Sequence, residues 1–148
     1  MITIKEVELD ETILSALISC SVDWEQENSC HGYRRNTADD IRGNQIFIAA
    51  DNGEIIGYLF GHAERTKEKT SLYEKDEPFF ELEELYIKPE FRNKGIGKTL
   101  FQYAEASIKP EIGLILLGTA TKNYRAILHF YLDELDMEFW SARLFKRI

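Results

Sequence analysis

"LEELYIKPEFRNKGIGKTLFQYAE", residues 82–105, is the stretch of sequence that decides the fold. It begins as a strand, passes through a proline-containing turn and a loop with two glycines, and continues as an amphipathic helix from about residue 95. Glycines let a loop backbone come close to a ligand, and the amides at a helix N-terminus attract anions. Because Arg92, Lys94 and Lys98 add positive charge beside these amides, the loop is typical of a pyrophosphate site.

Two better-known phosphate loops do not fit this stretch. The Walker pattern needs a glycine five residues before Gly97, where the chain has Arg92. The dinucleotide fingerprint matches Gly95 and Gly97 but then meets Leu100 in place of a third small residue, and no acidic residue follows about 20 positions later. Two interpretations remain: a pyrophosphate loop of another kind, or a glycine-containing turn with surface lysines.

Strand and helix patterns alternate around the loop. Asn52-Gly53 separates two β-rich runs within 45–66 and can adopt the positive φ angles of a tight hairpin turn. Asp10 and Thr37 are placed to cap helices. The first half therefore predicts antiparallel hairpins and the second half βαβ units, in a mixed α/β fold. Strands are expected at 2–8, on both sides of Asn52-Gly53, at 79–89, at 112–120 and at 137–148, with helices at 10–22, from about 37, at 95–108 and at 123–135.

Three connecting or closing segments carry further expectations. The apolar run "IGLILLGTA", 112–120, lacks polar alternation and predicts a strand covered on both faces. Residues 23–44 are mostly polar and could form one wall of a cleft. The closing segment, 137–148, predicts one or two strands, and its apolar and aromatic residues are compatible with edge pairing in a homodimer.

Composition limits the class of protein. A chain of 148 residues with 44% hydrophobic content fits a single domain over 1–148. A net charge of −8 argues against a nucleic-acid binder. No apolar run is long enough to cross a bilayer, no signal peptide is evident, and the two cysteines stand without a partner at metal-ligand spacing. We expect a cytoplasmic protein without membrane, nucleic-acid or metal partners.

The "RNKGIG" segment, Arg92–Gly97, fits [RQ]-x-x-G-x-[GA], the hallmark of the GNAT superfamily of N-acetyltransferases, and the order of elements over 2–148 resembles that family throughout. The resemblance implies a mixed, mostly antiparallel central sheet of six to seven strands flanked by about four helices. It also implies acetyl-CoA as co-substrate, with its pyrophosphate on the loop amides and its pantetheine arm along the preceding strand. The implied cofactor-binding residues are Leu85, Tyr86, Ile87, Arg92, Asn93, Lys94, Gly95, Ile96, Gly97, Lys98 and Asn123.

Transfer of an acetyl group to an amine requires a neutral amine, and a lysine-like amine is neutral in only about one molecule per thousand at pH 7. A carboxylate in the cleft can attract the cation and accept its proton. Strand alternation places Glu81 and Glu83 on one face and Glu84 on the other, although a bulge would change this parity. Glu81 and Glu83 are therefore the candidate bases, and solvated glutamates at a frayed strand start are the alternative.

The proton donor of the family is typically a tyrosine in a pattern like N-x-x-A-x-x-x-Y. Asn123 and Ala126 match this pattern, but Phe130 occupies the tyrosine position and the hydroxyl comes one residue later, at Tyr131. An insertion or a π-type bulge in the helix would reconcile the two. Tyr131 is the candidate acid, and Tyr124 is a weaker substitute.

Trp24 and Tyr33 lie in the polar first-half segment and are candidates to wall an amine site by stacking or cation–π contact, with ordinary packing as the alternative. The sequence thus predicts an acetyl-CoA-dependent N-acetyltransferase. Its acceptor would be a primary amine on a small cationic metabolite or an aminoglycoside-like compound, and less favourably a protein amine. The competing hypothesis is a noncatalytic acyl-CoA-binding sensor or regulatory module.

Overall fold

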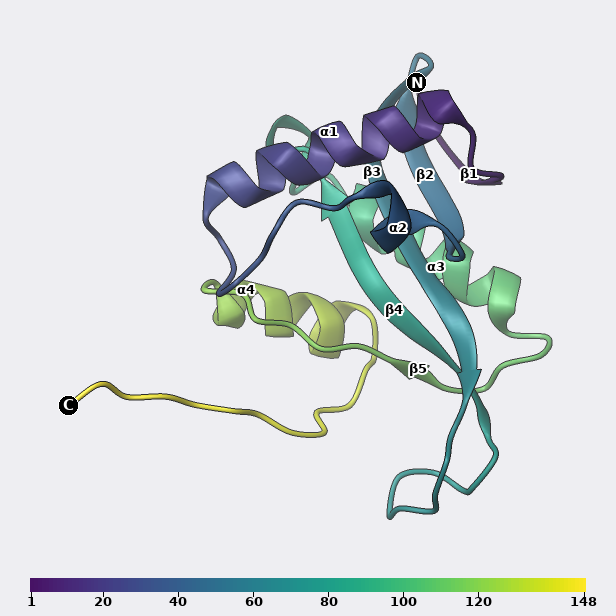
Figure 1. Ribbon diagram of the computed structural model, residues 1–148, viewed down its shortest axis with the longest axis vertical. Coiled ribbons are helices and arrows are strands. Elements are labelled where there is room, and N and C mark those ends of the chain that lie inside the picture. The colour runs from purple at the N-terminus through teal and green to yellow at the C-terminus, as the bar shows by residue number, and fades with distance from the viewer.

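A five-stranded mixed sheet runs through the computed structural model, which describes residues 1–148 (Figure 1). The strands lie in the order β1-β2-β3-β4-β5; the first three pairings are antiparallel and β4 pairs with β5 in parallel. The strands are β1 Ile2–Val7, β2 Gln45–Asp51, β3 Glu54–Arg65, β4 Pro78–Ile87 and β5 Ile115–Leu116.

Four α-helices, one 3₁₀ segment and one π-helix connect and follow the strands. They are α1 Glu11–Glu27, α2 Ala38–Ile41, the 3₁₀ segment η1 Pro89–Phe91, α3 Ile96–Ile108, α4 Tyr124–Leu128 and the π-helix η2 His129–Glu134. None of these helices combines the length and the apolar character needed to span a bilayer. The mixed α/β fold and the helix count agree with the sequence prediction.

Local sequence signals explain where the elements begin and turn. The Asp10 carboxylate accepts a hydrogen bond of 2.8 Å from the Ile13 amide and so caps α1. Thr37 forms a reciprocal capping box with Asp40 at the start of α2. Asn52 and Gly53 both adopt positive φ, 51° and 88°, in the hairpin turn between β2 and β3. These predicted caps and this turn are confirmed.

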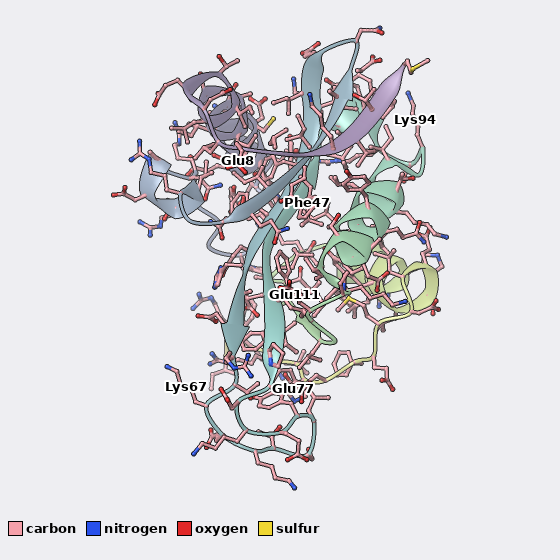
Figure 2. The ribbon with its side chains drawn as sticks, turned by 90° about the vertical axis from the view of Figure 1, so that its right-hand side faces the viewer. Glu8, Phe47, Lys67, Glu77, Lys94 and Glu111 are labelled. Atoms are coloured by element: carbon pink, nitrogen blue, oxygen red, sulfur yellow. The ribbon has the colours of Figure 1, made fainter.

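The sheet separates two hydrophobic clusters. Figure 2 shows α1 and α2 on one side of the sheet and α3 on the other, with Phe47 in the middle. Phe47, Leu59 and Leu100 belong to the cluster beneath α3, whereas Leu17 and Tyr58 belong to the cluster beneath α1. Burial of apolar side chains on both faces fixes the four long strands in register.

The end of the chain departs from the prediction. Residues 137–148 form no strand, so the sheet has five strands and not six or seven. The run 112–120 contributes only the two-residue β5, and Leu114–Leu117 are half-buried and not covered on both faces. The physical reason is that only one face of the run is covered: Ile115 and Leu117 pack against the cluster beneath α3, whereas Leu114 and Leu116, on the other face, pack against neither hydrophobic cluster.

Candidate active site

A cavity of about 950 Å³ opens between the second half of β4, the end of α1 and α4. Its size is within the range of pockets that hold drug-sized ligands. The lining residues come from α1 (Trp24 and Glu27), the loop after it (Ser29–Tyr33), β4 (Leu82–Ile87), the loop entering α3 (Phe91–Asn93 and Gly95–Lys98), the segment after β5 (Leu117–Thr121) and the last helical region (Asn123, Ala126, Ile127, His129–Tyr131 and Glu134).

The cavity exists because β4 and β5 separate. Only Phe80 and Glu81 of β4 pair with β5, opposite Ile115 and Leu116. The later residues of β4 keep their pairing with β3 but have no partner strand on the other edge. The predicted pantetheine strand, Leu85–Ile87, lines the cavity at this open edge. An extended ligand with amide groups can pair with such an edge.

The loop that enters α3 presents an uncapped helix N-terminus. Asn93 and Gly95 adopt left-handed backbone conformations, with φ of 61° and 79°. Gly95 is the N-cap of α3, and no side chain caps the helix. The first-turn amides of Ile96, Gly97 and Lys98 are therefore left for a ligand. A Cβ at Gly95 would meet nothing within 4 Å, so the loop is open, and these residues fit a pyrophosphate.

The three basic residues of the loop have different positions. Lys98 lines the cavity, whereas Lys94 does not. Figure 2 shows Lys94 extending outward beyond the loop, and its Nζ lies 5.6 Å from the centre of the Phe91 ring. Arg92 lines the cavity, but its Nε donates to the Ile87 carbonyl at 2.7 Å and its guanidinium pairs with Glu27 at 2.8 Å. Arg92 therefore joins the end of β4 to α1, and its charge is already compensated.

A bulge in β4 changes the predicted orientation of the glutamates. Phe60 faces Glu84 and Gly61 faces Leu82, so Glu83 is the extra residue. The orientation predicted for a regular strand, with Glu84 on the opposite face from Glu81 and Glu83, does not hold, and the alternative of a bulge that changes the parity is confirmed. All three carboxylates lie on the α1 side of the sheet, because the bulge shifts the alternation by one position.

Glu84 is the most buried of these carboxylates and was not among the predicted site residues. Its Oε1 accepts hydrogen bonds from the Tyr58 hydroxyl at 2.7 Å, the Asn36 amide at 2.9 Å and the Tyr33 hydroxyl at 3.1 Å. Burial raises the pKa of Glu84, although the three hydrogen bonds oppose this shift. Only the bulge, which β4 alone does not reveal, could have identified Glu84 as a cavity residue.

The two predicted bases have different positions. Glu83 lines the cavity and an adjoining polar pocket of about 400 Å³, and its Oε1 lies 3.7 Å from Nδ1 of His62. Glu81 pairs with His62 across the strands and lines neither space. Burial, followed by the charge of Glu83, raises the pKa of Glu81. The structure therefore brings Glu83 and Glu84 to the cavity, and leaves Glu81 outside it.

Trp24 and Tyr33, the predicted aromatic residues of an amine site, lie together in the cavity wall. The rings of Trp24 and Tyr33 stack with centroids 4.4 Å apart, and Trp24 also approaches Tyr86 at 5.2 Å. All three residues line the cavity. Since the Tyr33 hydroxyl donates to Glu84, the aromatic surface and the half-buried carboxylate form one continuous wall.

The last helical region carries Asn123 and Tyr131. The π-helix η2 includes Tyr131, and its widened turn shows in the hydrogen bond from the Leu135 amide to the Phe130 carbonyl at 3.1 Å. The predicted π-type bulge is confirmed. Tyr131 lines the cavity, and its hydroxyl makes no hydrogen bond within the protein. Burial raises the pKa of this hydroxyl. Asn123 occupies the N-cap position of α4, but its side chain makes no capping hydrogen bond. Asn123 also lines the cavity.

A short two-stranded contact closes one side of the cavity. Cys30 and Thr121 form an antiparallel bridge, flanked by bonds from the His31 amide to the Ala120 carbonyl and from the Lys122 amide to the Ser29 carbonyl, both 2.8 Å. We name residues 28–32 and 120–122 the strap. No local pattern predicted this pairing between segments about ninety residues apart.

Comparisons with known proteins agree with this geometry. The Acetyltransferase (GNAT) family model matches residues 11–136. An aminoglycoside acetyltransferase from an uncultured soil metagenomic sample, in complex with sisomicin, has a TM-score of 0.70 at 15% identity, covering 99% of this chain and 96% of that one. The aminoglycoside N-acetyltransferase AAC(6')-Iy in complex with CoA has a TM-score of 0.68 at 17% identity, covering 99% and 98%.

A third solved structure, the ribosomal-protein-alanine N-acetyltransferase from Brucella melitensis biovar Abortus 2308, has a TM-score of 0.67 at 14% identity and covers 99% of both chains. No curated protein sequence matches the chain significantly. At such low identities the structural likeness shows the fold alone, whereas the family model spans most of the sequence, including the α3 loop and the cavity. The chain belongs to the GNAT acetyltransferase family.

Proposed function

We propose that this protein transfers the acetyl group of acetyl-CoA directly to a primary amine on a small cationic molecule. One observation carries the proposal: the uncapped N-terminus of α3 and the half-buried carboxylate of Glu84 line the same cavity. The first feature suits an anionic cofactor, and the second suits a cationic acceptor. Bound acetyl-CoA would supply an activated thioester between them.

The cofactor would be held by backbone groups more than by side-chain charges. The amides of Ile96, Gly97 and Lys98 are free to bind the pyrophosphate, and Lys98 adds a cation at the same place. The open edge of β4 at Leu85–Ile87 offers backbone groups to the pantetheine arm. Backbone amides near Tyr86 or Ile87 are the proposed donors to the carbonyl oxygen as negative charge develops on it.

The acceptor amine would be deprotonated by the cavity carboxylates. All three hydrogen bonds to Glu84 end on Oε1, which leaves Oε2 to attract an ammonium group. Glu83 lies next to it in the chain and also lines the cavity. We assign Glu84 to binding and deprotonation, directly or through water, with Glu83 as the second carboxylate. Glu81, a base candidate by sequence, would act only by its charge on this pair.

Tyr131 is the proposed donor of a proton to the leaving thiolate. Its hydroxyl lines the cavity, and burial raises its pKa, so the phenol is protonated at neutral pH. Trp24 and Tyr33 would pack against the acceptor and stabilise its positive charge through their ring faces. The chain's net charge of −8 also favours encounter with cations.

Acceptors of the aminoglycoside type are the first to test, because structural neighbours are named as aminoglycoside acetyltransferases. The experiment measures free thiol released from acetyl-CoA in the presence of a panel of amines, including aminoglycosides, polyamines and N-terminal peptides. We expect turnover with a small cationic amine. Glu84→Gln should lower kcat/KM by about 10²–10⁴-fold, and Tyr131→Phe should lower kcat at unchanged cofactor affinity.

The noncatalytic alternative has one observation in its favour, since Phe130 occupies the position where the family pattern has a tyrosine. It predicts that acetyl-CoA raises the melting temperature while no amine in the panel is acetylated. It also predicts that Tyr131→Phe and Glu81→Gln leave the biological output of the sensor or regulatory module unchanged. That combination would contradict the enzyme proposal. Absence of any thermal shift with millimolar acetyl-CoA would contradict both.

A further inference from the structure

The polar pocket of about 400 Å³ beside the main cavity has a character of its own. It is bordered by α2, the loops around that helix, and β3 and β4, in front of which α2 lies in Figure 1. Phe60 is the only hydrophobic residue among the nine that line it. Glu83 and Glu84 line both spaces. The two carboxylates therefore border the space proposed for the reacting amine and also a second, more polar space.

The carboxylates around the polar pocket have oxygens without hydrogen-bond partners in the protein. Asp40 accepts bonds from the Thr37 amide at 2.7 Å and the Thr37 hydroxyl at 3.0 Å, both on Oδ2, which leaves Oδ1 unbonded. The hydrogen bonds to Glu84 all end on Oε1, and Glu83 accepts none. These oxygens suit a cationic group with several N–H donors, and a primary ammonium has three.

Asn36 provides evidence for a ligand that is independent of the carboxylates. The residue is only 8% exposed, and it lines the polar pocket but not the main cavity. Its Nδ2 donates to Glu84 at 2.9 Å, whereas its Oδ1 accepts no hydrogen bond. No fully covered side-chain oxygen in the structure lacks a partner, so Oδ1 is reached from the pocket. A nearly buried acceptor of this kind calls for a donor from a ligand.

The basic residues of the polar pocket compensate its negative charge only in part. The guanidinium of Arg42 lies 3.5 Å from Asp39, which is outside the pocket. Nδ1 of His62 lies 3.2 Å from Oδ1 of Asn44 and 3.7 Å from Oε1 of Glu83, so this nitrogen carries a hydrogen and is satisfied in the neutral ring. The pocket as a whole therefore favours a cation over an anion.

One molecule can reach both spaces, because the same two side chains border them. An ion pair extends to about 4 Å, so two ammonium groups that contact one carboxylate are less than about 10 Å apart. We propose that the polar pocket binds a second ammonium group of the acceptor, between Asp40, Asn36 and Glu83, while the reacting amine lies at Glu84. Preferred acceptors then carry two amino groups less than about 10 Å apart. This inference rests on the proposed function, which places the reacting amine at Glu84.

The test compares the binding of butylamine and diaminobutane, which have the same carbon chain and differ in the second ammonium group. Isothermal titration calorimetry at pH 7 uses the full-length chain saturated with CoA, so that no acetyl transfer takes place. Diaminobutane should bind at least about tenfold more tightly. Equal affinities, or no binding of either amine, would overturn the inference. A clear preference for diaminobutane without acetylation of any amine would instead contradict the proposed function and leave the pocket assignment standing.

Substitutions in the polar pocket locate the second ammonium group. Asp40→Asn removes a charge from the pocket and keeps an oxygen for the Thr37 amide, so it should lower the preference for diaminobutane about fivefold. The matched control is Asp23→Asn, which changes an exposed carboxylate outside both spaces and should leave the preference unchanged. Arg42→Gln leaves the capping box of α2 intact and should raise the preference. Equal effects of the two aspartate substitutions, or a lowered preference in Arg42→Gln, would refute the assignment.

Discussion

Burial and hydrogen bonding have opposite effects on the charged form of Glu84. Burial beneath α1 and α2 makes its charge costly, while three hydrogen bonds to Oε1 stabilise that charge. The net effect is a raised pKa, so burial outweighs the hydrogen bonds. A carboxylate with a raised pKa is a stronger base than an ordinary surface glutamate and is therefore better suited to accept a proton. Function at this position is therefore expected to reduce stability.

The pH dependence of stability tests this expectation at Glu84. A carboxyl whose pKa is higher in the folded than in the unfolded state contributes stability below the unfolded pKa, and that contribution is lost as pH rises through the folded pKa. The melting temperature of Glu84→Gln relative to the wild type should thus rise as the pH increases above about 4. A relative gain of about 2–4 °C corresponds to about 1 kcal/mol in a chain of this length.

The control is Glu90→Gln, which changes an exposed carboxylate outside both cavities. Its melting temperature should follow the wild type at every pH. Thermal unfolding followed by circular dichroism from pH 4 to 8 gives the comparison. If Glu84→Gln lost stability relative to the wild type as pH rises, the hydrogen bonds would outweigh burial and the assignment would be wrong.

At the scale of elements, the bulge between β3 and β4 decides which carboxylates reach the cavity. Gly61 lies at the register shift, and a Cβ there would collide with the Glu81 carbonyl oxygen and approach the Phe80 ring to 2.7 Å. Glycine is therefore required for the two strands to approach. The bulge in turn aligns Glu83 and Glu84 on the α1 side.

Gly61→Ala should disturb both stability and site geometry. Since backbone must shift to admit the methyl group, we expect a loss of about 2–3 kcal/mol and a melting temperature lower by about 5–10 °C. Acetyl transfer should fall more than acetyl-CoA binding, because the shift is at the carboxylates and not at the α3 loop. Gly113→Ala is the matched control, as a Cβ there meets nothing within 4 Å. Equal effects of the two substitutions would refute the role given to the bulge.

At the scale of the whole molecule, the cavity lies between two parts of the fold that are held to the sheet by different numbers of strand pairings. β3 and β4 share nine paired positions, whereas β4 and β5 share two. The region after β5 is further attached through the strap and through packing of Phe130 and Tyr131 against the α3 side. A cofactor lying between β4 and this region would add contacts to both and hold them together.

Hydrogen exchange measured by mass spectrometry tests that picture. Without ligand, amides of 115–135 should exchange faster than those of β2 and β3, since fewer long-range pairings hold them. Saturating acetyl-CoA should slow exchange in 93–98 and 115–135 and leave β2 and β3 nearly unchanged. Protection spread evenly over the chain, or confined to the sheet, would contradict the proposed cofactor position.

The sequence determined the features that depend on neighbouring residues. The caps at Asp10 and Thr37, the Asn52-Gly53 turn and the uncapped glycine loop all follow from local backbone and side-chain chemistry. The one-residue offset of Tyr131 likewise predicted the π-helix that the structure contains. Such signals extend over a few residues, so no partner segment is needed to interpret them.

Only the tertiary structure decided the features that depend on distant partners. The bulge arises from how β3 pairs with β4, and it moved Glu84 into the cavity wall and left Glu81 outside it. The strap joins segments that share no local pattern, and residues 137–148 have strand composition but form no strand. A β-strand's neighbours, register and exposed face are set by long-range pairing, and one displaced residue reverses which side chains reach the site.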